Sequence, residues 1–177
     1  WNILRQISIN LCLSIGMTLV ILAAGIDLSV GAVLALSGAV AAGLLKDGVV
    51  LTPLAVKLQF TVFGAIVAGL LVGAAAGAFN GLVITRFRLP SFVATLGMLS
   101  IARGLTMLWT RGFPITDLGP GFGYIGTGVF LAAPMPVWIS CALVAVFIVL
   151  TRKTRFGRYI YAVGGNERAA LLTGLPV

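Results

Sequence analysis

Charged residues divide the chain into long apolar runs. No Asp, Glu, Lys or Arg occurs within residues 6–26, 28–45, 58–85 and 118–151. A transmembrane helix needs about 20 apolar residues to cross roughly 30 Å of hydrocarbon, so these runs are long enough, or nearly so, to span a bilayer. A further run, residues 89–109, contains one charge. In the run at residues 118–151, glycines and prolines crowd the first half, so only the second half is suited to cross the membrane.

The pattern predicts an all-α, polytopic membrane protein with about five spans. Lipid cannot satisfy backbone polar groups, so only helices or closed barrels cross it, and these runs lack the alternation of barrel strands. Residues 1–151 form the predicted transmembrane region, and residues 152–177 form a cytoplasmic segment. The spans are expected near residues 4–25, 28–45, 60–84, 89–109 and 135–151.

The amino-acid composition supports the prediction of a membrane protein and argues against an enzyme. Of the 177 residues, 60% are hydrophobic and 9% are charged, against about 25% charged in soluble domains. The chain has no histidine, four carboxylates and two distant cysteines, so most hydrolytic, metal-dependent and thiol chemistry lacks its residues. We expect no catalytic residue, no metal and no cofactor held by this chain.

The net charge of +8 reflects topology and not nucleic-acid binding. Basic residues concentrate next to apolar runs, as they do in the cytoplasmic loops of membrane proteins. If the C-terminal tail is cytoplasmic, alternating spans place seven bases inside and four outside. The inner seven are Arg86, Arg88, Arg152, Lys153, Arg155, Arg158 and Arg168, and the outer four are Arg5, Lys46, Lys57 and Arg111.

Asp27 lies between the first two spans, within Gly25–Gly31. One interpretation is a simple turn, in which Asp27 caps a helix that begins at Leu28. The other is a helix broken within or near the membrane, where irregular backbone lines a watery path and a carboxylate is functional.

Two further intramembrane features have alternative interpretations. Asn80 either bonds to a neighbouring helix or faces a polar path, and Arg103 either extends outward to the interface or faces a water-filled cavity. We therefore take Asp27, Asn80 and Arg103 as candidate residues of a substrate path. A stripe of glycines at steps of four predicts close helix packing: Gly69, Gly73, Gly77 and Gly81.

The tail after residue 151 reads as a basic interface, a Gly164–Gly165 turn and a short helix capped by Asn166. Such a short helix is unstable alone, which favours a docking element over a plain loop. None of the three lysines completes a Gly-Lys-Ser/Thr phosphate loop, so any ATP would be bound by a partner.

Four segments resemble the permease subunit of bacterial ribose-type sugar ABC importers. They are Gly25–Gly31 (GIDLSVG), Leu89–Gly97 (LPSFVATLG), Arg103–Thr106 (RGLT) and Phe156–Glu167 (FGRYIYAVGGNE). The resemblance covers the whole chain, and the glycine-rich tail is its most specific part. It also implies further helices on either side, so this chain is expected to be a piece of a longer permease.

The resemblance implies a multi-pass protein of the bacterial inner membrane. Its expected partners are a cytoplasmic ATPase subunit that binds ATP, a periplasmic sugar-binding protein and a second permease copy in a homo- or heterodimer. Residues 157–174 resemble the loop that couples permease to ATPase. The expected coupling residues within it are Gly157, Arg158, Gly164, Gly165, Asn166, Glu167 and Arg168.

The expected function is therefore translocation of a monosaccharide by alternating access, driven by ATP hydrolysis in the partner. Two alternatives remain: a transporter driven by an ion gradient, in which Asp27 would be the coupling carboxylate, and a membrane scaffold that transports nothing.

Overall fold

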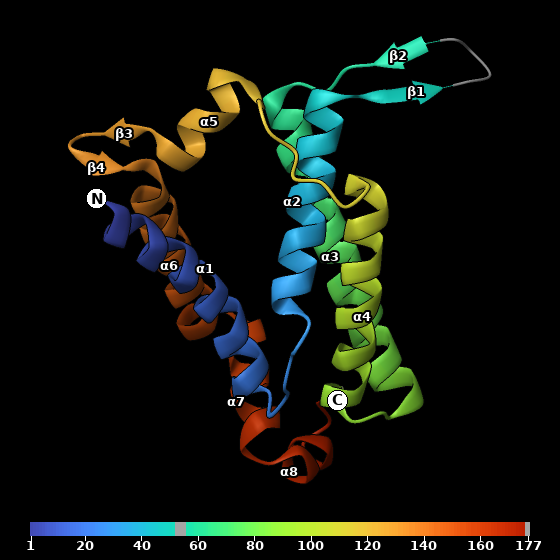
Figure 1. Cartoon of the computed structure of the whole chain (residues 1–177). Helices are drawn as coiled ribbons and strands as arrows, with labels where there is room; N and C mark the ends of the chain where they lie inside the picture. Colours follow the sequence, from blue (N-terminus) through green and yellow to red (C-terminus); the bar gives the residue numbers. More distant parts are fainter. Residues whose placement is uncertain (52–55, 176–177) are drawn as a thin grey trace. The chain divides into compact units, whose positions relative to one another are not determined.

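The computed structural model describes residues 1–51 and 56–175 of the chain (Figure 1). They form two compact units. Unit 1 comprises residues 1–26 and 124–177, and unit 2 comprises residues 27–123. Each unit is described on its own.

Unit 2 is built from three helices, α2 (Val30–Lys46), α3 (Val62–Phe87) and α4 (Ser91–Thr110). Helix α2 packs against both others. It is antiparallel to α3, because its start contacts Asn80 and its middle contacts Gly69. It is parallel to α4, because Leu28 contacts Thr95 and Ala39 contacts Trp109 (Figure 1).

Local signals set the ends of these helices. The Thr61 hydroxyl accepts a hydrogen bond from the Gly64 N–H at 3.2 Å and so caps the start of α3. Helix α3 ends where Arg88 adopts a left-handed φ of 50°, and Pro90 precedes the first residue of α4. Arg111, with a φ of 54°, ends α4. The chain therefore turns sharply at charged residues outside the apolar helices.

Small residues dominate the interior of unit 2, and large apolar residues lie outside. Ala41, Ala65 and Ala102 are buried, whereas Phe63 and Leu108 are each 77% exposed. A soluble monomer rarely exposes contiguous apolar surface on this scale. This outward-facing apolar surface is suited to contact with lipid.

Unit 1 pairs helix α1 (Asn2–Leu22) with α6 (Met135–Lys153), followed by α7 (Arg155–Gly165) and α8 (Glu167–Leu172). The guanidinium of Arg5, in the first turn of α1, donates to the Thr127 carbonyl at 2.8 Å. The next carbonyl, that of Gly128, accepts from the N–H of Met135 at the start of α6 at 2.9 Å. At the opposite ends, Leu22 and Thr151 line one hollow. Helices α1 and α6 therefore run in the same direction.

Among the described residues, helices α1, α3, α4 and α6 are long and apolar enough to cross a membrane, and α2 is a shorter apolar helix of 17 residues. Within unit 2, α2, α3 and α4 alternate in direction, as successive crossings of a bilayer would require. The predicted all-α, polytopic class is confirmed.

Short elements between the helices were not predicted. Strand β1 (Val49–Leu51) pairs antiparallel with β2 (Val56–Leu58), and β3 (Val129–Phe130) pairs antiparallel with β4 (Ala133–Pro134). Helix α5 (Gly119–Thr127) occupies the glycine-rich stretch that precedes β3. These elements connect helix ends and leave the helical class unchanged.

The glycine stripe on α3 is in contact over only half of its length within unit 2. A methyl group at Gly69 would lie 2.9 Å from the Ser37 carbonyl oxygen, and one at Gly73 would lie 3.1 Å from the Ser37 hydroxyl. At Gly77 and Gly81, such a group would meet open space beside the helix among the described residues. The packing role predicted for all four glycines thus has a visible partner, α2, at two of them.

We expect Gly69→Leu to destabilise the protein by about 1–3 kcal/mol, because the side chain would have to displace the backbone of α2. Gly77→Leu is the matched control on the same helix face. The yield of monodisperse protein after detergent extraction measures the difference. An equal loss of monodisperse protein in both variants would mean that Gly77 is also packed, against a partner outside unit 2.

Candidate functional site

Three polar features follow helix α2 from its start to its end within unit 2. We name them the α2-start cluster (Asp27, Ser29, Asn80 and Thr95), the Arg103 hollow and the Trp109 hollow. The two hollows lie between α2 and α4. Together the three features are called the polar seam.

Asp27 organises the start of α2. One of its carboxylate oxygens accepts from the Ser29 N–H at 2.7 Å and from the Ser29 hydroxyl at 2.6 Å. Helix α2 consequently begins at Val30 with Ser29 as its N-cap. The expectation that Asp27 caps a helix beginning at Leu28 was therefore wrong: Asp27 fixes a turn that ends at the N-cap residue Ser29, and the helix begins at Val30.

Two neighbouring helices complete the cluster. The Asn80 amide donates to the Ser29 hydroxyl at 3.3 Å, and the Leu28 N–H donates to the Thr95 hydroxyl at 3.2 Å. The Ser29 side chain is fully buried, with 0% exposure. Of the two interpretations of Asn80, the structure shows the bond to a neighbouring helix. Buried polar groups satisfied in this way hold three helices in one register.

The cluster lies inside the ends of the helices that surround it. Thr95 is four residues after the start of α4, and Asn80 is seven residues before the end of α3. At 1.5 Å per residue, these positions are about 6 Å and about 10 Å from the helix ends. The chain before α2 is therefore non-helical at a depth where α3 and α4 are helical, which favours the broken-helix interpretation.

Arg103 faces a separate hollow. It lies 12 residues after Ser91, about 18 Å along a helix that is about 30 Å long. The hollow has a volume of about 150 Å³ and lies between small residues of α2 and polar residues of α4. Its lining residues are Gly31, Ala32, Ala35, Arg103, Thr106 and Met107.

Arg103 and the α2-start cluster occupy different levels of the seam. Arg103 follows Thr95 by eight residues of α4, about 12 Å along the helix. Arg103 lines the hollow together with the small side chains of α2, and it is exposed. Its five N–H donors suit the hydroxyl and carbonyl oxygens of a polar solute.

The larger hollow, near the ends of α2 and α4, was missed by the sequence analysis. It encloses about 540 Å³ and is lined by Gly43, Asp47, Gly48, Leu108, Trp109, Thr110 and Arg111. The Trp109 indole N–H donates to the Ala39 carbonyl at 3.0 Å, which fixes the ring against α2. An aromatic face beside a carboxylate and a guanidinium can bind a neutral polyol. The sequence does place a charged residue after each of the two helices, Asp47 after α2 and Arg111 after α4. Only the parallel packing of α2 and α4 brings these two residues into one hollow.

The predicted coupling residues lie in unit 1, on α7, α8 and the residue between them. Thr154 caps α7 by accepting from the Gly157 N–H, and Asn166 caps α8 by accepting from the Ala169 N–H at 3.0 Å. Gly174 follows α8 with a φ of 81°. The predicted cap at Asn166 is confirmed. Arg158, Gly165, Asn166, Glu167 and Arg168 are exposed, as docking residues would need to be.

The predicted Gly164–Gly165 turn was wrong, because both glycines belong to the last turn of α7. Gly164 lies against the Leu22 carbonyl at the end of α1, where a methyl group would overlap the backbone. Gly157 likewise lies against the Thr151 carbonyl of α6. These two glycines have a packing role inside unit 1, whereas Gly165 has open space.

These features define a class: a polytopic helical membrane protein with polar groups along a helix seam and short amphipathic helices after its last span. Among the described residues, no three His, Cys, Asp or Glu side chains gather as a metal site. The chain belongs to the family described as the branched-chain amino acid transport system / permease component, whose family model matches residues 1–177. It is thus a multi-pass protein of the bacterial inner membrane, in a family of transport components.

Curated relatives are similar over the full length of this chain. The ribose import permease RbsC of Haemophilus influenzae is 43% identical over 180 residues, covering 99% of this chain and 52% of the relative. RbsC of Bacillus subtilis is 46% identical over 178 residues, with 99% and 52% covered. The L-arabinose ABC transporter permease AraH of Azospirillum brasilense is 38% identical over 173 residues, with 97% and 48% covered.

The chain therefore spans about half the length of the curated relatives that it matches. No solved structure matches it.

Proposed function

We propose that this chain is part of the permease subunit of an ABC importer that carries a monosaccharide, ribose or a related sugar, across the inner membrane. The observation that carries the proposal is the 43–46% identity to ribose import permeases over 99% of the chain. Relatives at 37–38% identity are named for L-arabinose, galactofuranose and D-allose. The substrate class is therefore a neutral sugar.

The polar seam is the proposed sugar path. Asp27 and Asn80 support its lower level, and Arg103 supplies donors at its middle level. The Trp109 hollow lies at the end that faces outward in the predicted orientation, where sugar would arrive from a periplasmic sugar-binding protein. A neutral sugar needs hydrogen-bonding groups spaced along an otherwise apolar passage. The Arg103 and Trp109 hollows offer such groups at two levels, while the buried α2-start cluster holds the helices that line the path in register.

The exposed residues that follow the Gly164 contact form the proposed dock for the ATPase subunit, which binds and hydrolyses ATP. Residues 165–168 begin at the end of α7, and α7 touches both α6 and α1. Movement of this segment on ATP binding would therefore reach two membrane helices directly. With a second permease copy, such movement would open the path to one side at a time.

Sugar uptake by the full-length protein with its partner subunits tests this proposal. Proteoliposomes loaded with ATP should accumulate radiolabelled ribose or a related sugar, and depletion of ATP should abolish uptake while an ion gradient is maintained. Uptake that persists without ATP would exclude the ABC-importer mechanism. Failure to transport any sugar of the panel with all partners present would favour a scaffold.

Asp27→Asn distinguishes an ion-driven transporter. Such a transporter would lose coupling when its carboxylate is neutralised, yet continue without the ATPase. In the structure, the Asp27 carboxylate is engaged by the Ser29 N–H and hydroxyl, and an asparagine oxygen can accept the same bonds. We expect Asp27→Asn to retain at least about a third of ATP-dependent uptake, because both bonds can still form, although each changes from a charge-assisted bond to a neutral one.

Labelling with an impermeant thiol reagent tests the proposed orientation. Phe156, near the start of α7 in unit 1, is 53% exposed, and Phe113, just after α4 in unit 2, is 74% exposed. In a background lacking Cys12 and Cys141, Phe156→Cys should react only from the cytoplasmic side and Phe113→Cys only from outside. The opposite pattern would overturn both the orientation and the ATPase dock.

A further inference from the structure

An apolar groove runs between α1 and α6 in unit 1, at the end of these helices that carries the basic residues. It has a volume of about 170 Å³. Its walls are Ile15, Thr18, Leu19 and Leu22 of α1, and Val144, Phe147, Ile148 and Thr151 of α6. The groove begins about 10 Å before the end of α1, at 1.5 Å per residue, so it lies within one leaflet.

Helix α7 closes the end of this groove. Gly157 rests on Thr151 of α6, and Gly164, two turns later on the same face, rests on Leu22 of α1. Helix α7 therefore lies across the ends of both helices. Tyr161, between the two contacts, lines the groove. A tyrosine at this level, with an apolar ring and a polar hydroxyl, is typical of the membrane–water interface.

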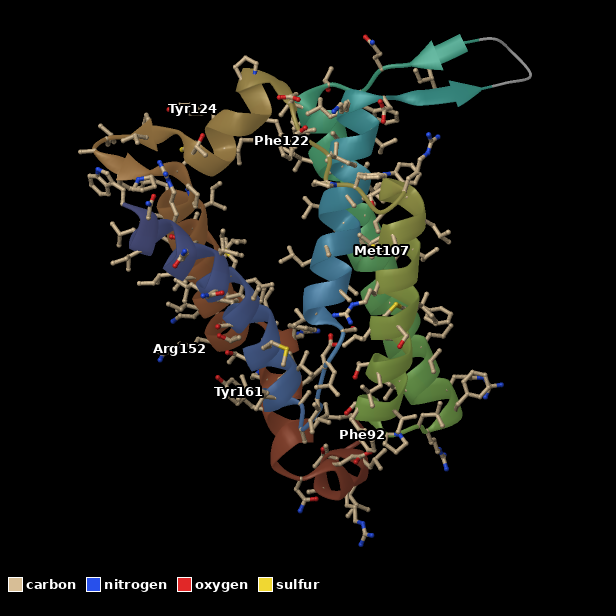
Figure 2. All side chains as sticks on the ribbon, viewed as in Figure 1. Phe92, Met107, Phe122, Tyr124, Arg152 and Tyr161 are labelled. Carbon is tan, nitrogen blue, oxygen red and sulfur yellow. The ribbon has the colours of Figure 1, made fainter. Side chains whose placement is uncertain are left out.

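Three basic residues follow Thr151, the last groove-lining residue of α6, within four positions of the chain. Arg152 and Lys153 form the last turn of α6, and Arg155 begins α7, all three exposed. The sequence contains no carboxylate from residue 118 to residue 166. Figure 2 shows Arg152 and Tyr161 on the same side of unit 1. The cations are thus adjacent to the groove and are not neutralised by acidic residues nearby in the sequence.

We propose that this groove is a binding site for an anionic phospholipid of the cytoplasmic leaflet. An acyl chain occupies the groove, and the phosphate lies among Arg152, Lys153 and Arg155. Charge complementarity carries the choice of ligand: the groove is apolar and lies in the membrane, while its open end is cationic at headgroup level. A zwitterionic lipid would match the groove but not its cationic end.

Lipid retention by the full-length protein tests the charge requirement. Native mass spectrometry after addition of phosphatidylglycerol or phosphatidylcholine should show at least about tenfold stronger retention of phosphatidylglycerol. The variant Arg152→Gln/Lys153→Gln should lose this preference. The matched control Arg86→Gln/Arg88→Gln removes two bases that are also predicted to be cytoplasmic, but in unit 2, and should keep it. Equal retention of both lipids, or equal effects of the two variants, would overturn the proposal.

A photo-crosslinking residue tests the groove itself. Benzoylphenylalanine in place of Ile148, whose side chain is 51% exposed in the groove wall, should capture phospholipid in native membranes. Capture of another segment of the permease or of a second copy would show that protein fills the groove, and would overturn the proposal. The same residue at Leu70, on the apolar outside of α3, measures unspecific capture. The yield at Ile148 should exceed it and should fall with Arg152→Gln/Lys153→Gln.

Discussion

Gly164→Ala is expected to reduce the amount of folded permease sharply, whereas Gly165→Ala is expected to leave it unchanged. A methyl group at Gly164 would overlap the Leu22 carbonyl, which is backbone and cannot rotate away. Overpacking typically costs about 1–3 kcal/mol, and a clash with backbone falls at the upper end of that range. The amount of monodisperse permease extracted from membranes, and its thermal stability, measure the effect.

Gly165 is the matched control because it is the adjacent glycine of the same helix and has open space around it. Alanine there should even favour the helix slightly. Gly157→Ala should behave like Gly164→Ala, since a methyl group there would overlap the backbone of Thr151. If all three variants folded normally, the contacts of α7 with α1 and α6 would be wrong.

Arg103→Met is expected to lower sugar uptake by about 10- to 100-fold without loss of folded protein. A hydrogen bond from a charged donor contributes about 1.5–3 kcal/mol, and each 1.36 kcal/mol is a factor of ten. Methionine removes the donors and is compatible with a membrane helix. The initial rate of ATP-dependent uptake, divided by the amount of permease in the membrane, measures the effect.

Arg103→Lys serves as the companion variant. It keeps the positive charge but replaces the planar fork by a single ammonium. Partial uptake in Arg103→Lys together with loss in Arg103→Met would indicate that the charge and its hydrogen bonds act on the solute. Normal uptake in Arg103→Met would mean that Arg103 extends to the interface and takes no part in the path.

The sequence was sufficient to predict the long helices, because a helix that crosses the bilayer needs a run of about 20 apolar residues. The apolar run at residues 60–84 corresponds to α3, Val62–Phe87, and the run at 89–109 to α4, Ser91–Thr110. The start of α2 differed from the predicted residue 28, because capping depends on local geometry. Asp27 bonds to Ser29, so the helix begins after Ser29. Hydropathy contains no information about such a turn.

The contacts between helices could not be predicted in the same way. The glycine stripe indicated a close approach, but not that α2 meets only Gly69 and Gly73 within unit 2. Gly164 and Gly165 look equivalent in the sequence, and only the path of α7 past Leu22 distinguishes them. The Trp109 hollow depends on two spans that end side by side, a relation between residues more than 60 positions apart. Tertiary packing decides each of these features.

Helix α7 can act as a short rigid lever, because it contacts the ends of two membrane helices at two fixed points. Gly157 contacts the end of α6, and Gly164 contacts the end of α1. The two contacts are seven residues, or about 10 Å, apart along α7. Because both contacts are backbone against backbone, little side-chain compliance absorbs a displacement. A tilt of α7 by about 10° would raise one membrane helix relative to the other by about 2 Å over that span. A push on one end of α7 would therefore become a sliding movement between two parallel helices, whose direction depends on which end is pushed.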